Sequence, residues 1–269
     1  MREFVYYDGA AINPADAKIG AVTSAVLYGK GVFTTVSIYD GKPFLWEKHW
    51  RRLVTSTSKL GIDLSEQSEI HSLNALRDTI ATSGLTDGRA RITFSFDSSS
   101  HIWSSENVET RTSLSIIVAE RRPIPENFKL TISPHRINTT SPLVGIKSCN
   151  YLEHLLAYEE ASKRGFHEAI RLNERGEISS VCMANVFWEK DGKLYTPSPK
   201  TGCLAGTTRG YVLENVECNE VETGIEELER ADRIFLTSAG IGVVAVAEFI
   251  GRRLDTSQHP LSQMIPSIP

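Results

Sequence analysis

Apolar residues recur along the chain with the spacing of strands in some stretches and of helices in others. Short apolar runs between turn residues predict strands, and longer runs with helical spacing predict two early helices. The expected early strands are a hairpin over Phe4 to Ile12, a strand ending at Tyr39, and strands over Arg89 to Phe96 and Ser113 to Ala119; the expected helices cover Trp46 to Leu60 and Leu64 to Ser83. We therefore expect a smaller α/β domain over residues 1–120.

The second half of the chain has more predicted strands than predicted helices. Residues 121–127 contain two prolines, which disfavour both helix and central strand and so predict an interdomain linker. Strands are expected at Lys129–Ser133, Glu168–Leu172, Glu177–Val181, Asn185–Glu189, Lys193–Pro197 and Arg233–Ala239, with a helix at Gly210–Asn215. Because few crossover helices separate these strands, we expect a larger, barrel-like mixed-sheet domain over residues 128–269, and an α+β protein.

One lysine precedes the clearest helix signal of the second half. Lys147 lies in the stretch 145–153, before apolar residues at helical spacing, with Asn150 and Glu153 as an expected capping box and Gly165 as the expected stop. A lysine held in an apolar pocket has a lowered pKa, which an amine that forms Schiff bases requires. On these residues alone, a solvated surface lysine is the commoner arrangement.

Composition narrows the class of protein. The 269 residues are 41% hydrophobic and 23% charged, values typical of a globular protein that buries a large core. The net charge of -4 gives no electrostatic reason to expect nucleic acid as a partner. No apolar run reaches the roughly 18 residues of a membrane span, and the N-terminus lacks a signal peptide's apolar region, so we expect a cytoplasmic protein with no membrane partner.

The cysteines and histidines indicate neither a metal site nor a disulfide framework. The four cysteines lack CxxC spacing, and the seven histidines form no HExxH cluster. Motifs of a serine nucleophile elbow, a P-loop and a dinucleotide-binding turn are also missing from the sequence. We therefore expect no metal, and the partner to be a small molecule.

Several motifs occur in the order and at the spacing of one known family. They are the segments 31–35 (GVFTT), 52–53 (RL), 145–152 (GIKSCNYL), 185–187 (NVF) and 202–209 (GCLAGTTR). Together they resemble the class IV aminotransferases, the fold-type IV group of pyridoxal-phosphate (PLP) enzymes, which includes branched-chain and D-amino acid aminotransferases and 4-amino-4-deoxychorismate lyase. The resemblance implies the fold-type IV fold, a PLP cofactor, an amino acid or keto acid substrate, and a homodimer.

The resemblance also assigns residues to the cofactor. It implies that Lys147 forms the Schiff base with PLP and carries protons, and that Arg52, rather than its neighbour Arg51, contacts the phosphate. A guanidinium suits this role because it donates two parallel hydrogen bonds and stays charged. Thr207 and Thr208 lie at the start of the helix expected over Gly210–Asn215, where backbone N–H groups bind anions, and the resemblance implies that they hold the phosphate. The remaining implied cofactor contacts are Tyr151, Ser180, Ser238 and Ala239.

The resemblance also implies that two segments contribute to the substrate pocket. The glycine-spaced segment before the strand ending at Tyr39 implies that Tyr28, Phe33 and Thr35 line the substrate pocket, although a glycine-rich turn before a core strand explains the segment equally well. In the polar loop 97–105, the family's Arg-Gly pair is missing. His101 and Trp103 could line a different pocket there, with a surface loop as the alternative.

Ser180 is the most informative departure from the family pattern. The resemblance places a glutamate at this position, where its carboxylate contacts the pyridine nitrogen of PLP. Side chains alternate along a strand, so Glu177, three positions earlier, is expected to face the opposite side and not to substitute.

Three functions remain open at this stage. The first is a PLP-dependent aminotransferase acting through Lys147 on an amino acid or similar amine. The second is an elimination of the 4-amino-4-deoxychorismate lyase type, which the GVFTT segment and Thr237-Ser238-Ala239 favour. The third is a non-catalytic PLP-binding descendant, which Ser180 and the altered loop favour.

Overall fold

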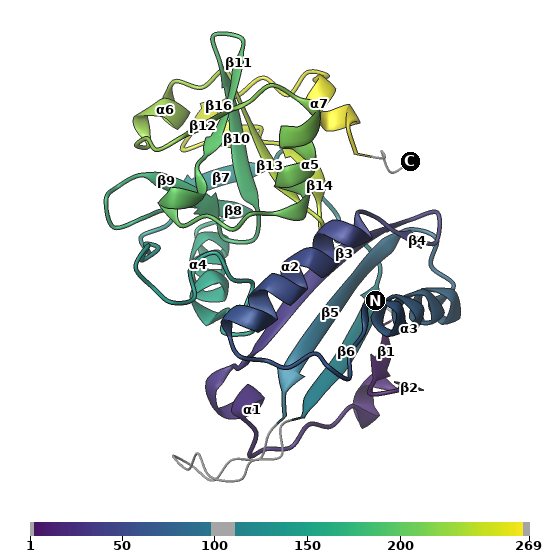
Figure 1. Cartoon of the computed structure of the whole chain (residues 1–269). Coiled ribbons are helices and arrows are strands. Elements are labelled where there is room, and N and C mark those ends of the chain that lie inside the picture. Colours follow the sequence, from purple (N-terminus) through teal and green to yellow (C-terminus); the bar gives the residue numbers. More distant parts are fainter. Residues whose placement is uncertain (1–2, 98–110, 266–269) are drawn as a thin grey trace. The chain divides into compact units, whose positions relative to one another are not determined.

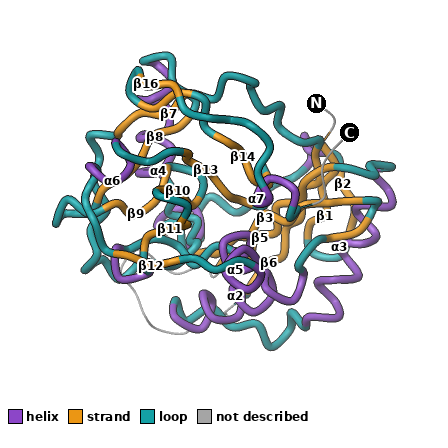
Figure 2. Tube along the Cα trace, turned by 90° about the horizontal axis from the view of Figure 1, so that it is seen from above, coloured by secondary structure: helices purple, strands orange, loops and turns teal. Residues whose placement is uncertain are grey.

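The computed structural model describes residues 3–97 and 111–265, and the chain divides into two compact units (Figures 1 and 2). The first unit comprises Met1–Arg121 and Ile146–Asn150, and the second comprises Arg122–Gly145 and Tyr151–Pro269. The chain thus leaves the first unit at Arg121 and returns to it for a short segment that contains Lys147. From the sequence, this segment was expected within the larger domain over residues 128–269.

An antiparallel six-stranded sheet forms the first unit, in the order β2-β1-β6-β5-β3-β4 (Figure 1). Its strands are β1 (Glu3–Tyr7), β2 (Ala10–Ile12), β3 (Gly31–Tyr39), β4 (Lys42–Pro43), β5 (Gly88–Phe96) and β6 (Thr112–Ala119), and its helices are α1 (Ser24–Tyr28), α2 (Trp46–Lys59) and α3 (Glu69–Ser83), with a 3-10 turn, η1, at Pro14–Asp16. Val32 and Val36 of β3 share one core with Leu53 of α2 and Leu76 of α3. Both long helices therefore cover the same face of the sheet.

Local capping explains where α3 begins. The Ser68 side chain accepts a hydrogen bond from the backbone N–H of His71 at 3.2 Å, and Gly84 ends the helix with a φ of 69°. The predicted start at Leu64 was wrong, because Leu64 packs against the core from a turn closed by the Gln67 N–H to the Leu64 carbonyl at 2.9 Å.

The Lys147 segment runs beside the start of β3. The Phe33 N–H donates to the Lys147 carbonyl at 2.9 Å, and the Cys149 N–H donates to the Gly31 carbonyl at 2.8 Å. A Cβ at Gly31 would lie 2.9 Å from the Phe94 carbonyl oxygen and 3.0 Å from Cys149 Sγ. A side chain at residue 31 would therefore clash with the backbone of β5 and crowd the Cys149 side chain of the segment.

The second unit is built from two mixed five-stranded sheets, in the orders β12-β11-β10-β13-β14 and β16-β15-β7-β8-β9. The strands are β7 (Lys129–Ile132), β8 (Glu168–Leu172), β9 (Ile178–Val181), β10 (Asn185–Lys190), β11 (Lys193–Pro197), β12 (Asn219–Val221), β13 (Arg233–Ser238), β14 (Gly242–Ala245), β15 (Glu248–Phe249) and β16 (Arg252–Arg253). The helices are α4 (Leu152–Lys163), α5 (Thr207–Asn215), α6 (Glu226–Glu229) and α7 (Pro260–Gln263), with a 3-10 turn, η2, at Pro199–Thr201. Residues from both sheets, such as Ile170 of β8 and Trp188 of β10, belong to one core.

The start of α4 differs from the prediction. Its N-cap is Tyr151, with no side-chain capping hydrogen bond, so the expected Asn150 and Glu153 capping box was wrong. Glu153 instead lies 3.5 Å from the guanidinium of Arg171 on β8. An ion pair with the neighbouring strand has replaced the local contact.

The prediction of an α+β fold with a strand-rich mixed-sheet second half is confirmed. Short strands β12, β14, β15 and β16 were not predicted. Within residues 3–97 and 111–265, no helix is long and apolar enough to cross a membrane. In the same residues, His, Cys, Asp and Glu side chains form no group of three or more that could hold a metal ion.

Candidate active site

The side chain of Lys147 lies against an aromatic ring and near two other cations. Its Nζ is 4.5 Å from the centroid of the Phe33 ring. Burial, followed by the charges of Arg52 and Arg91, lowers the pKa of Lys147 to about 7. At neutral pH about half of such amines are uncharged and nucleophilic, whereas an ordinary lysine with a pKa of about 10.4 is almost fully protonated.

Arg52 belongs to this cluster through β3. Its Nη2 donates to the Thr34 hydroxyl at 2.6 Å, and the same hydroxyl lies 2.6 Å from Nδ1 of His49. Burial, Arg52 and Lys147 hold the pKa of His49 well below its usual range, so its ring is neutral. Arg51, by contrast, is exposed on α2. The structure thus places Arg52, and not Arg51, beside Lys147.

Arg91 is a member of the cluster that the sequence analysis missed. On β5 it stands opposite Thr35 of β3, and its guanidinium stacks on the Phe33 ring at 3.6 Å from the centroid. The core residues Ala90 and Ile92 flank it, so Arg91 points to the sheet face that α2 and α3 leave uncovered. The sequence did hold a signal for this residue, because Arg91 is a charged residue between the apolar residues Ala90 and Ile92 of a predicted strand.

Three residues were predicted to line the substrate side in the first unit. Phe33 is buried and contacts both Lys147 and Arg91, and Thr35 follows it on the same face of β3. Tyr28 is the last residue of α1 and is 48% exposed. The predicted residues His101 and Trp103 lie outside the described residues.

In the second unit, the predicted anion-binding threonines stand at the start of α5. Thr207 and Thr208 are its first residues, both are buried, and Gly206 is the N-cap. A Cβ on Gly206 would lie 2.1 Å from the Asn185 side-chain oxygen, so only glycine fits. Arg209 donates to the Pro197 carbonyl at 2.9 Å and forms an ion pair with Glu220. These contacts hold α5 to β11 and β12.

Asn185 links the start of α5 to the end of β13. Its side chain donates to the Leu204 carbonyl at 2.8 Å, and its backbone pairs with Thr237 across the β10–β13 ladder. Ser238 and Ala239 follow Thr237 at the end of β13, where the Ser238 hydroxyl accepts from the Gly240 N–H at 3.3 Å. Both predicted cofactor segments of this region therefore meet at Asn185.

Ser180 stands opposite a buried arginine. In the β8–β9 ladder it pairs with Arg171, so the two side chains share a face, and they are 6% and 1% exposed. Arg171 donates to the carbonyls of His135 at 3.2 Å and Arg136 at 2.9 Å. A cation therefore lies on the strand next to the position where the family resemblance implied a carboxylate.

His154 and Tyr151 lie beside Arg171. Nδ1 of His154 is 2.9 Å from the Cys182 carbonyl and 3.4 Å from Nη1 of Arg171. Since a carbonyl only accepts and an arginine only donates, the shorter contact assigns a proton to Nδ1. The Tyr151 ring stacks on this imidazole with centroids 4.2 Å apart.

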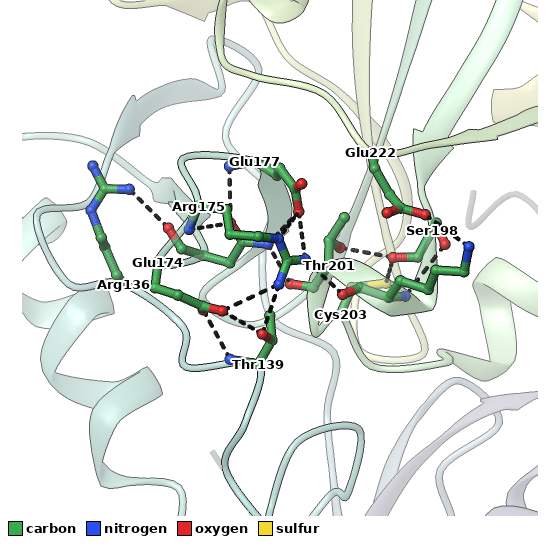
Figure 3. A network of polar contacts seen from close by, with 11 residues as sticks. Arg136, Thr139, Glu174, Arg175, Glu177, Ser198, Thr201, Cys203 and Glu222 are labelled. Atoms are coloured by element: carbon green, nitrogen blue, oxygen red, sulfur yellow. Dashed lines mark hydrogen bonds and ion pairs between the residues drawn. The ribbon is translucent and has the colours of Figure 1, made fainter.

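The Glu177 carboxylate forms hydrogen bonds with residues of its own turn. A β-bulge between β8 and β9 places Ile178 opposite Leu172, and Ser180 opposite Arg171, so the regular alternation assumed from the sequence does not hold. The Glu177 carboxylate nevertheless accepts from Arg175 at 2.6 Å and from the Asn173 side chain at 2.7 Å (Figure 3). It therefore does not take the place of the missing glutamate.

Figure 3 also shows how the turn before β9 holds two distant segments of the second unit. Arg175 donates to the Thr139 hydroxyl at 2.9 Å and to the Lys200 carbonyl at 3.0 Å. Glu174 accepts from the Thr139 N–H at 3.0 Å. The segment that leads toward Lys147 and the segment that leads into α5 are thus fixed to one turn.

Comparisons with known proteins show the family of the chain. Residues 31–249 match the family described as Amino-transferase class IV. Among curated proteins, the chain is 28% identical to a putative branched-chain-amino-acid aminotransferase of Methanocaldococcus jannaschii, with 94% of this chain and 90% of that protein covered. It is 30% identical to the aminodeoxychorismate lyase of Bacillus subtilis, with 89% and 84% covered.

Solved structures show the same fold. The T.th. branched-chain amino acid aminotransferase, complexed with N-(5'-phosphopyridoxyl)-L-glutamate, superposes with a TM-score of 0.84 at 21% identity, over 97% of this chain and 90% of that one. The chain has the fold-type IV fold of these PLP enzymes, and it belongs to the class IV aminotransferase family.

Proposed function

We propose that this protein is a PLP-dependent aminotransferase acting on an amino acid or similar small amine through Lys147. The observation that carries the proposal is the Lys147 amine, with its pKa of about 7 and two arginine charges nearby. Burial of this kind makes a lysine both a nucleophile and a proton carrier near neutral pH.

The residues present fit PLP. Within the first unit, an amine with a lowered pKa suits the aldehyde and the Arg52 guanidinium suits a phosphate. Within the second unit, the first turn of α5, with its glycine N-cap, has by itself the chemistry of an anion site. When bound, PLP supplies a carbonyl that condenses with amines and a ring that withdraws electrons from the adjacent carbon. Lys147 would hold the cofactor, release it to the incoming amine, and move a proton at the amine-bearing carbon.

Arg91 supports a substrate that carries a carboxylate. Its charge helps to lower the pKa of Lys147, and its guanidinium lies over the same Phe33 ring that the Lys147 amine approaches. A guanidinium this near the reacting amine is suited to hold an acid group of the substrate. This role fits amino acids and keto acids better than simple amines.

A lyase is the second candidate. Ser180, with Arg171 opposite, offers no carboxylate to keep the ring nitrogen of PLP protonated. A less electron-withdrawing ring favours eliminations that expel a leaving group early over complete amino transfer. The similarity to an aminodeoxychorismate lyase adds support for this function.

We also propose a homodimer. Leu152, Leu155 and Leu156 on α4 are 60%, 42% and 48% exposed, an apolar surface that a second subunit would bury. Light scattering after size-exclusion chromatography gives the mass directly, and a monomer at micromolar concentration would contradict this part of the proposal.

The test combines one spectrum and one product assay. The purified protein incubated with PLP should absorb in the visible, lose that band with sodium borohydride, and become covalently labelled at Lys147 as seen by peptide mass spectrometry. Lys147→Ala should keep its fold by circular dichroism and give no labelled peptide. Full turnover by this variant would exclude Lys147 as the PLP amine.

The product assay separates the two enzyme functions. Formation of a new amino acid from a keto acid indicates an aminotransferase, and formation of 4-aminobenzoate and pyruvate from aminodeoxychorismate indicates a lyase. Cofactor binding without either product would support the non-catalytic descendant.

A further inference from the structure

The hydroxyl of Thr34 lies between two groups of the Lys147 cluster. Thr34 is fully buried on β3 and faces α2, where His49 and Arg52 stand one helical turn apart. Its oxygen is 2.6 Å from Nδ1 of His49 and 2.6 Å from Nη2 of Arg52. Both contacts are short, and Thr34 and His49 are buried, whereas Arg52 is half-buried.

The chemistry of the three groups fixes the direction of each hydrogen bond. Arginine only donates, so the Thr34 oxygen accepts from Nη2. The Thr34 proton then needs an acceptor, and in the part of the chain that the structure describes, the acceptor in contact with it is Nδ1 of His49. A histidine that accepts at Nδ1 is neutral and carries its proton on Nε2.

We infer that His49 and Thr34 are positioning residues for Arg52: neutral His49 accepts a hydrogen bond from the Thr34 hydroxyl, which turns a lone pair of the Thr34 oxygen toward the guanidinium and so orients Arg52. One guanidinium nitrogen is thereby held to the sheet, so the orientation in which Arg52 meets an anion is set before the anion arrives. The identity of that anion as the PLP phosphate rests on the proposed function.

The protonation state of His49 supports a positioning role over a purely structural one. The His49 pKa is lowered by burial and by the charges of Arg52 and Lys147, two members of the cluster, so the neutral ring is the form that the cluster favours. A charged His49 would donate toward the Thr34 oxygen, in competition with Arg52, and would add a further positive charge to the cluster.

Threonine variants test the inference through cofactor affinity. Thr34→Val keeps the shape of the side chain and removes the hydroxyl, and it should weaken PLP binding between about 10-fold and 100-fold, the range for losing a hydrogen bond to a charged group. Thr34→Ser restores the hydroxyl and should bind within about 3-fold of wild type. The affinity is measured by titrating the PLP-free protein and following its tryptophan fluorescence.

A matched control separates affinity from stability. Thr79→Val removes another buried threonine hydroxyl in the same unit, one that donates to the Ala75 carbonyl at 2.7 Å within α3. It should lower thermal stability as much as Thr34→Val does, yet leave PLP affinity unchanged. Equal PLP affinity in Thr34→Val and the wild type would overturn the inference.

The histidine tautomer gives an independent readout. In the PLP-free protein with ¹⁵N-labelled histidine, long-range ¹H–¹⁵N spectra should show His49 with an unprotonated Nδ1 at neutral pH, and Thr34→Val should shift that nitrogen. A proton on Nδ1 of His49 would overturn the inference, because His49 could not then accept the hydrogen bond from Thr34. This spectrum does not depend on PLP. A wild-type protein that binds no PLP would refute the proposed function, but the His49 tautomer would still show whether His49 and Thr34 orient Arg52.

Discussion

Replacing Ser180 by glutamate tests the electronic consequence of the missing carboxylate. The new carboxylate would lie on the same face as Arg171, since directly opposed residues have Cβ atoms about 4.5–5.5 Å apart. An ion pair at about 4 Å is worth about 4 kcal/mol at the effective dielectric of protein sites, which offsets most of the cost of burying the charge. We therefore expect Ser180→Glu to fold, to bind PLP, and to hold its carboxylate ionised.

The expected gain is in amino transfer. If the carboxylate keeps the ring nitrogen of PLP protonated, stabilisation of the developing charge by even about 1.4 kcal/mol raises the half-reaction rate about tenfold. Single-turnover stopped-flow absorbance with an amino donor measures this rate, and the ¹⁵N chemical shift of labelled PLP reports the protonation of its ring nitrogen. The elimination rate, measured as pyruvate formation from aminodeoxychorismate, should rise less.

Arg171 provides the control for this reasoning. In the Arg171→Leu background, Ser180→Glu would leave a buried carboxylate without its cation, and the double variant should lose at least about 1 kcal/mol more stability than the sum of the single variants. A Ser180→Glu protein that binds PLP normally, with unchanged rate and unchanged ¹⁵N shift, would show that residue 180 is not beside the ring nitrogen.

Two further predictions concern the first unit. Arg52→Ala should weaken PLP binding by about 1.5–3 kcal/mol, measured by titration, while Arg51→Ala, on the exposed side of α2, should not change it; equal losses would mean that the wrong arginine has been assigned. The rate of PLP attachment, followed by stopped-flow absorbance, should rise from pH 6 to pH 8 with an inflection near the Lys147 pKa of about 7, because the attacking amine must be uncharged. An inflection near about 10, as in a solvated lysine, would contradict the burial of this amine.

Periodicity and turn residues predicted most of the secondary structure and the α+β class. They failed where tertiary contacts outweigh the local signal. Leu64 has helical spacing with the residues of α3, yet it packs from a turn, because Ser68 caps the helix one turn later. Asn150 and Glu153 match a capping box, yet the carboxylate of Glu153 lies beside a cation on a neighbouring strand.

The candidate site was predicted unevenly, for physical reasons. Lys147 and Arg52 stand in local motifs, so their positions could be recognised along the chain. Arg91 could not, because its importance arises from strand pairing that brings it over Phe33. The same holds for Arg171, which becomes informative only once the bulge between β8 and β9 sets it opposite Ser180.

The path of the chain between the units bears on how the protein is synthesised and folds. The strand β3 meets the Lys147 carbonyl and the Cys149 N–H only after the ribosome has made β7 and the turns that follow it. A nascent or truncated chain ending at Arg121 would therefore expose the Phe33 N–H and the Gly31 carbonyl at a strand edge. Neither unit corresponds to one continuous stretch of gene, so the first unit cannot be exchanged or expressed as a simple fragment without losing the segment that carries its reactive amine.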